Sequence, residues 1–205
     1  MLKNTLNGFL AGICIALGGS VFLACENKTT GAVLFSVALL CICWQGYSLY
    51  TGKICFIPEK HGKDEFSVLL CGLLGNLLAT VAFGYIVRLG IPSIGEKALS
   101  VCTGKLEGQS FVQTLVRGFM CGILIYLAVI VYRENRTPLG IIVCIPVFIL
   151  SGYEHSIADM FYFASSGMLS FRAFLFIMTV VLGNTAGGML IPAIKLLMHR
   201  EEKTE

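Results

Sequence analysis

The residues best suited to chemistry in this chain form one short polar stretch inside a long apolar run. The stretch is Ser151–Ser156, and Asp159 follows His155 by four residues. An ionisable group at that depth is costly in lipid and is therefore a functional candidate. Histidine has an unperturbed pKa of about 6.5, and either of its forms can donate a hydrogen bond to an anion. The alternative is a structural histidine bonded to a neighbouring carbonyl group.

The two acidic residues near His155 are assigned structural roles. Glu154 would repel an anion, so we expect it to bind the backbone N–H groups of a broken helix or to pair with a cation. Asp159 shares a helix face with His155 if the segment is helical, and it could pair with His155 or with a helix end. The H-E-x-x-H spacing of zinc hydrolases is absent. The pattern therefore predicts no metal site and disfavours a membrane-embedded enzyme.

A second polar stretch, Gln45–Lys53, interrupts an earlier apolar run. Irregular backbone at membrane depth is tolerated only where protein buries it or water lines it. The hydroxyl group of Thr51 both donates and accepts, and we expect it to face His155. Three residues that flank the two breaks could form an apolar constriction, which would filter solutes by dewetting, although ordinary helix packing would also explain them. They are Leu49, Tyr50 and Phe148.

The elements that must hold these residues are apolar helices. The chain has 205 residues and a mean hydropathy of +0.83, and 13% of its residues are charged. A soluble domain carries roughly a quarter charged residues, and a membrane span needs about 20 apolar residues. The first run is too long for the core of a signal peptide, which predicts a retained span. Six segments are predicted: Leu6–Cys25, Gly31–Pro58, Phe66–Leu89, Phe111–Tyr132, Pro138–Ala164 and Phe171–Met198.

The two halves of the chain correspond. Gly75-Asn76 in the third segment recurs as Gly183-Asn184 in the sixth, 108 positions later, and the breaks at Thr51 and His155 are 104 positions apart. One duplication of three helices, about 1–92 and 105–198, explains both offsets. Because three is odd, the copies must have opposite topology. Interrupted segments at matching places point to a transport site between inverted repeats, with Asn76 and Asn184 in structural roles.

Lysine and arginine are unevenly distributed between the two ends of these segments, which predicts their orientation. A cytoplasmic N-terminus places eight cations inside and four outside, so both termini are predicted to be cytoplasmic in a multi-pass protein of the cell membrane. The net charge of +3 is too small to indicate a nucleic-acid partner. The inner cations are Lys3, Lys60, Lys63, Arg133, Arg136, Lys195, Arg200 and Lys203, and the outer cations are Lys28, Lys97, Lys105 and Arg172.

Lys105 lies in the predicted outer loop before the fourth segment. A cation at the mouth of a pore raises the local concentration of anions. A solvated loop lysine is the simpler explanation of this residue on its own.

Residues 151–161, with the sequence SGYEHSIADMF, closely resemble the signature of the formate/nitrite transporter family. Leu49–Gly52 resembles the first pore loop of that family. The pairs Gly75-Asn76 and Gly183-Asn184 match its Gly-Asn positions, and the resemblance covers nearly the whole chain. The chain departs from the family pattern at Gly122 and Lys53, where asparagine is common, at Ser48, where an acidic residue is common, and at Tyr50, which replaces a frequent phenylalanine.

The resemblance implies a homopentamer with one aquaporin-like pore in each protomer. Such pores pass formate, nitrite, hydrosulfide or a short monocarboxylate such as lactate. The resemblance places Thr51 on a mobile loop and His155 on the fifth segment, and it makes Lys105 a vestibule lysine. Leu49, Tyr50 and Phe148 would form the outer constriction, and Phe35 and Leu39 the inner one.

These observations predict an all-α membrane protein with a single channel domain, 1–205. It would have six transmembrane helices in two inverted three-helix repeats, with the second and fifth helices broken. The predicted function is proton-coupled or pH-dependent passage of a small monovalent weak-acid anion. The resemblance favours formate, with nitrite or hydrosulfide as alternatives. A membrane-embedded enzyme and a neutral-solute pore are less favoured, and the Asn-Pro-Ala motifs of the latter are absent. Lipid is the expected surrounding, and no cofactor is expected.

Overall fold

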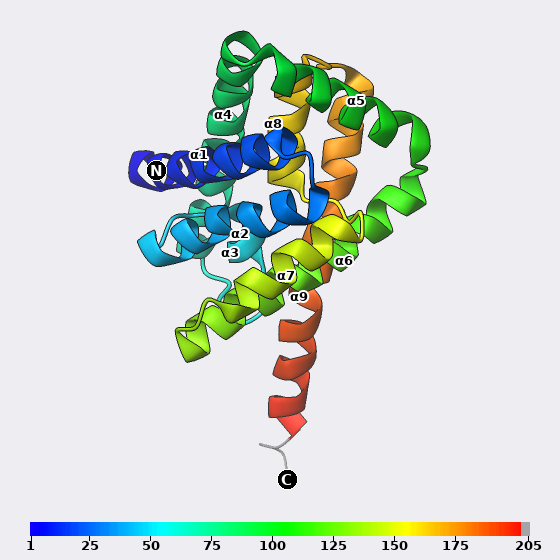
Figure 1. The fold of residues 1–205 in the computed structure, drawn as a ribbon. Coiled ribbons are helices and arrows are strands. Elements are labelled where there is room, and N and C mark those ends of the chain that lie inside the picture. Colours follow the sequence, from blue (N-terminus) through cyan, green and yellow to red (C-terminus); the bar gives the residue numbers. More distant parts are fainter. Residues whose placement is uncertain (202–205) are drawn as a thin grey trace.

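The computed structural model describes residues 1–201, which form nine α-helices and no strand (Figure 1). Four complete helices, α1, α2, α4 and α6, and residues 171–199 of α9 are long and apolar enough to cross a bilayer. Lys203, one of the predicted inner cations, lies outside the described residues. The helices are α1 (Leu2–Ala24), α2 (Lys28–Gln45), α3 (Tyr50–Ile54), α4 (Lys63–Gly90), α5 (Pro92–Gly108), α6 (Phe111–Asn135), α7 (Leu139–Leu150), α8 (Ser156–Ser166) and α9 (Phe171–Glu201).

The second and fifth predicted segments are both broken. In the second, α2 ends at Gly46, whose φ of 70° is left-handed, and the chain continues to the five-residue α3. In the fifth, Gly152 has a φ of 69° between α7 and α8. Left-handed backbone carries little steric cost only for glycine. A glycine among polar residues therefore ends the helix at the two places where the sequence predicts interruptions.

The structure contains a helix, α5, in residues 92–108, where the sequence pattern predicts a loop between the third and fourth segments. Its buried residues recur every four positions at Ile94, Ala98, Cys102 and Leu106, and this stripe packs against α8. Charged residues on its other faces make it too polar to be read as a span. In Figure 1, α5 crosses the upper right of the molecule, away from the N-terminus at the left and the C-terminus at the bottom.

Two helix pairs approach very closely, α1 with α4 and α6 with α9. A Cβ atom on Gly75 of α4 would lie 2.1 Å from the carbonyl oxygen of Thr5 on α1. A Cβ atom on Gly183 of α9 would lie 2.6 Å from the carbonyl oxygen of Leu115 on α6. Small residues allow such approaches where no hydrophobic force drives association in lipid. The two Gly-Asn sequences therefore mark equivalent helix contacts in the two halves.

Candidate functional site

Each broken segment is held by one buried asparagine. Asn76 Oδ1 accepts from the backbone N–H of Tyr50 at 2.9 Å, and its Nδ2 donates to the carbonyl oxygens of Gly8 and Ser48 at 2.7 and 3.0 Å. The carboxamide therefore satisfies backbone groups that the break leaves without helical partners.

Asn184 makes the equivalent set in the other half. Its Oδ1 accepts from the N–H of Ser156 at 2.9 Å, and its Nδ2 donates to the carbonyl oxygens of Gly118 and Glu154, both at 2.8 Å. Asn184 is 1% exposed and Asn76 is fully buried. These contacts fix the start of α3 and the start of α8, which carry the candidate residues Thr51 and His155.

The structure brings Thr51 and His155 together. Thr51 Oγ1 lies 2.8 Å from His155 Nε2, and both side chains are buried. The ring of Phe148 stacks on the imidazole of His155 with a centroid separation of 5.9 Å. Two polar side chains from residues far apart in the sequence therefore meet where the two breaks face each other.

The imidazole of His155 also caps the start of a helix, and this determines which ring nitrogen carries the proton in the neutral form. His155 is the N-cap of α8, and its Nδ1 accepts from the backbone N–H of Ala158 at 3.2 Å. A nitrogen that accepts cannot carry a proton, so the proton of the neutral ring sits on Nε2. Nε2–H then donates to Thr51 Oγ1, and the Thr51 O–H remains available to donate to a solute.

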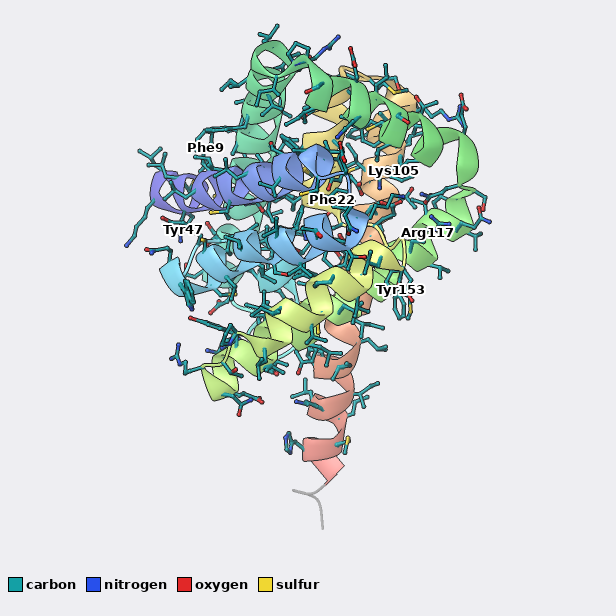
Figure 2. The ribbon with its side chains drawn as sticks, in the orientation of Figure 1. Phe9, Phe22, Tyr47, Lys105, Arg117 and Tyr153 are labelled. Atoms are coloured by element: carbon teal, nitrogen blue, oxygen red, sulfur yellow. The ribbon has the colours of Figure 1, made fainter. Side chains whose placement is uncertain are left out.

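One side of this pair faces a cavity of about 320 Å³, which we call the Lys105 cavity. Figure 2 labels four of its lining residues, Phe22, Lys105, Arg117 and Tyr153. His155, Glu154 and Asp159 also line it. It is formed mainly by α5, α8 and the break between α7 and α8.

Lys105 is not the loop residue that the sequence predicts. It lies on α5, and its side chain is only 14% exposed. Its ammonium group forms ion pairs with Glu154 and with Asp159, the latter at 3.0 Å. Gln109 Nε2 donates to the second carboxylate oxygen of Glu154 at 2.6 Å. Glu154 therefore pairs with a cation, one of its two expected partners, whereas Asp159 pairs with Lys105 rather than with His155.

A second cavity, of about 460 Å³, is lined by the neighbours of Thr51 in the chain; we call it the Lys53 cavity. Gly52 and Lys53, the two residues after Thr51, line it. Tyr47, another lining residue, lies at the left of Figure 2, well apart from Arg117 at the right. Its charged lining residues are Lys53, Lys60, Asp64, Glu65, Arg133 and Arg136.

Four of the five expected constriction residues line a cavity. Phe148 and Phe35 line the Lys105 cavity, whereas Leu49 and Leu39 line the Lys53 cavity. The grouping into an outer constriction (Leu49, Tyr50 and Phe148) and an inner one (Phe35 and Leu39) stays a prediction. Phe35 and Leu39 are one helical turn apart, about 6 Å along α2, which is enough to place them at different cavities.

Tyr50, the fifth of these residues, has its hydroxyl group engaged. The Tyr50 hydroxyl lies 2.9 Å from Thr185 Oγ1 on α9. Thr185 Oγ1 donates to the carbonyl oxygen of Val181 at 2.7 Å, so the Tyr50 O–H is the donor in the pair. The hydroxyl that distinguishes tyrosine from phenylalanine here ties α3 to α9.

Two residues of the site were missed in the sequence analysis. Gln109 binds Glu154, and Arg117 lines the Lys105 cavity from α6. The signal for Arg117 was available, because it is the only charged residue in the apolar stretch from Phe111 to Tyr132. Nothing in the sequence around Gln109 distinguishes it from an ordinary loop residue.

Residues 1–198 match the model of the family described as "Formate/nitrite transporter". Among curated proteins, the chain is 25% identical over 234 residues to the formate-nitrite transporter of Plasmodium ovale, covering 96% of this chain and 75% of that protein. It is 30% identical over 181 residues to the nitrite transporter NirC of Salmonella typhimurium, covering 77% of this chain and 65% of that protein.

Among solved structures, the chain is similar to a pentameric formate channel with formate bound. The TM-score is 0.79 at 23% identity, and the match covers 97% of both chains. This similarity shows a shared fold, and the family-model match spans nearly the whole chain. The chain therefore belongs to the formate/nitrite transporter family, and it is a multi-pass membrane transporter or channel rather than an enzyme.

Proposed function

We propose that this chain passes small monovalent weak-acid anions across the cell membrane, with formate as the leading substrate. The observation that carries the proposal is that the hydrogen-bonded pair of Thr51 and His155 is next to both cavities in the chain. His155 lines the Lys105 cavity, and the residues that follow Thr51 line the Lys53 cavity. A route through the pair would connect the two ends of the molecule.

In this proposal, the hydrogen bond from His155 orients Thr51 so that its O–H donates to the anion. Apolar residues on both sides of the pair, Phe35 and Phe148 at one cavity and Leu39 and Leu49 at the other, make a bare charge costly there by several kcal/mol. The solute therefore passes the apolar region as the neutral acid, which carries its proton with it. Flux would rise as the pH of the loading side falls.

Lys105 has an electrostatic role in the same proposal. Glu154 and Asp159 both line the cavity and would repel an anion. Because the Lys105 ammonium pairs with both carboxylates, it cancels one of their two formal negative charges and reduces this repulsion. An isolated buried carboxylate costs far more than a paired one, so the same contact also stabilises α5 against α8.

The proposal includes an architecture. The equivalent hydrogen bonds of Asn76 and Asn184, and the equivalent helix contacts at Gly75 and Gly183, support two inverted repeats within one channel domain. The similar formate channel is pentameric, which supports a homopentamer with a pore in each protomer. The distribution of lysine and arginine supports cytoplasmic termini.

Flux into proteoliposomes tests the substrate. The purified protein would be compared with protein-free liposomes for formate, nitrite, hydrosulfide and lactate at two external pH values. We expect formate to move fastest and each weak acid to move faster at the lower pH. Faster nitrite flux would favour nitrite, the substrate in the name of the 30% identical relative. Glycerol swelling with no anion flux at either pH would contradict the proposal.

A further inference from the structure

The Lys105 cavity holds a cation that the proposed pathway leaves without a role. Arg117 is the seventh residue of α6, about 9 Å along a helix that is otherwise uncharged for its first five turns. A charge inside a spanning helix is expensive unless it faces a water-filled space or a partner. Arg117 lines the cavity, so its position requires an explanation beyond helix packing.

The guanidinium group of Arg117 has donors to spare. Its one described hydrogen bond runs from Nη1 to the carbonyl oxygen of Gly152, and at 3.4 Å this bond is long. Among the described side chains, no carboxylate lies within ion-pairing distance of Arg117. A guanidinium presents several N–H donors in a planar fork that matches a carboxylate or a small oxoanion. The free donors of Arg117 therefore suit such an anion.

The charge balance of the cavity depends on Arg117. Lys105 is shared by Glu154 and Asp159, which leaves this cluster with one formal negative charge. Lys28 and Arg117 are the other cations lining the cavity, and they bring its formal charge to one positive. Without Arg117 the cavity would be formally neutral, and an anion would have no net attraction to it.

The backbone holds Arg117 beside the break. Its carbonyl oxygen accepts from the N–H of Glu154 at 3.3 Å. The carbonyl oxygen of the next residue, Gly118, accepts from Asn184. The guanidinium therefore projects from backbone that is fixed to the same break as His155, and a binding group on a rigid element is positioned more precisely than one on a loop.

We propose that Arg117, assisted by Lys28, is the capture site for a small carboxylate or oxoanion at the Lys105 cavity. This inference rests on the proposed anion transport. It assigns the first contact of the anion to Arg117, because the Lys105 ammonium is already bound by two carboxylates. After capture, the anion moves past Lys105 toward Thr51 and His155.

The test is the concentration dependence of formate flux in proteoliposomes at low and high ionic strength. For Arg117→Gln we expect the half-saturating formate concentration to rise about tenfold, with maximal flux little changed. The salt dependence of that concentration should largely disappear, because screening acts on the charge that was removed. Arg117→Lys should retain the parent's salt dependence. Arg88→Gln, at the end of α4 and outside both cavities, should behave like the parent.

Lys28→Gln provides a second measurement if Arg117→Gln fails to assemble. Lys28 is exposed at the start of α2, so we expect its substitution to leave the core packing intact and to raise the half-saturating concentration by a smaller factor. An assembled Arg117→Gln protein, or failing that a Lys28→Gln protein, with the parent's half-saturating concentration and salt dependence would overturn the capture site alone. Absence of anion flux in the parent protein would instead overturn the proposed function and the capture site together.

Discussion

Asn76 and Asn184 make the same three hydrogen bonds in the two halves of the chain. Each accepts from the backbone N–H that begins the second part of a broken segment, and each donates to two carbonyl oxygens. One carbonyl belongs to the preceding break and the other to the adjacent helix, α1 or α6. The two asparagines therefore hold the two breaks by one repeated arrangement.

Replacing either asparagine should destabilise the protein. Asn76→Ala or Asn184→Ala leaves one N–H and one carbonyl group of the break unpaired, and each such buried group costs about 1–3 kcal/mol. We expect a lower melting temperature in detergent and loss of assembled protein. Asn7→Ala is the matched control, because its hydrogen bonds are long, 3.3 and 3.5 Å, and the residue is half-buried. Equal melting temperatures for all three variants would show that the hydrogen bonds of Asn76 and Asn184 do not stabilise the protein.

Substitutions of His155 should separate its two roles. His155→Asn keeps a side-chain acceptor for the N-terminus of α8, and asparagine is a favourable N-cap. It should therefore melt near the parent's temperature while formate flux falls about tenfold or more, because the hydrogen bond that orients the Thr51 donor toward the anion is lost. His155→Ala should lose the same flux and also about 1 kcal/mol of stability. A His155→Asn protein with the parent's flux and pH profile would contradict the assigned role.

The hydroxyl group of Thr51 should matter more than its methyl group. Thr51→Ser retains the donor, so we expect flux within about twofold of the parent. Thr51→Val has nearly the same shape but leaves His155 Nε2–H unpaired and removes the donor to the anion, so flux should fall about tenfold or more. Thr80→Val is a suitable control, since the Thr80 hydroxyl bonds only to backbone oxygens of its own helix. Equal formate flux in Thr51→Val and Thr80→Val would contradict the role assigned to the Thr51 hydroxyl group.

Lys105 should contribute to stability as well as to transport. Lys105→Met leaves Glu154 and Asp159 buried without their cation, and breaking a buried ion pair in this way costs about 3–5 kcal/mol. Adding Glu154→Gln and Asp159→Asn to Lys105→Met should recover most of the lost melting temperature. If Lys105 acted only as a free vestibule cation, Lys105→Met would reduce flux and leave the melting temperature unchanged.

The breaks and their residues could be predicted because local sequence determines them. Gly46 and Gly152 adopt left-handed backbone among polar neighbours and interrupt their helices there. Such an interruption is easy to recognise because the surrounding sequence is apolar. Helix α5 was missed because its apolar stripe is narrow and its other faces carry charges, so it has neither the length nor the hydropathy of a span. A helix that lies against others needs only one apolar face.

The partners of Lys105 could not be predicted, because they depend on how distant elements pack. Glu154 is 49 positions from Lys105, and nothing local distinguishes a lysine on α5 from a solvated one. The cavity that each expected constriction residue lines depends on the same packing. The order of Phe35 and Leu39 along α2 gives their depth, but it does not say that one lines the Lys105 cavity and the other the Lys53 cavity.

The tie between Tyr50 and Thr185 has a consequence for motion. Helix α3 has only five residues, too few to be stable by its own hydrogen bonds. One phenolic O–H links it to α9, a helix from the opposite end of the sequence. A displacement of α9 would therefore be transmitted to the segment that carries Thr51. A chain with phenylalanine at position 50 would lack this hydrogen bond. Its Thr51 hydroxyl group would then be held less firmly beside His155.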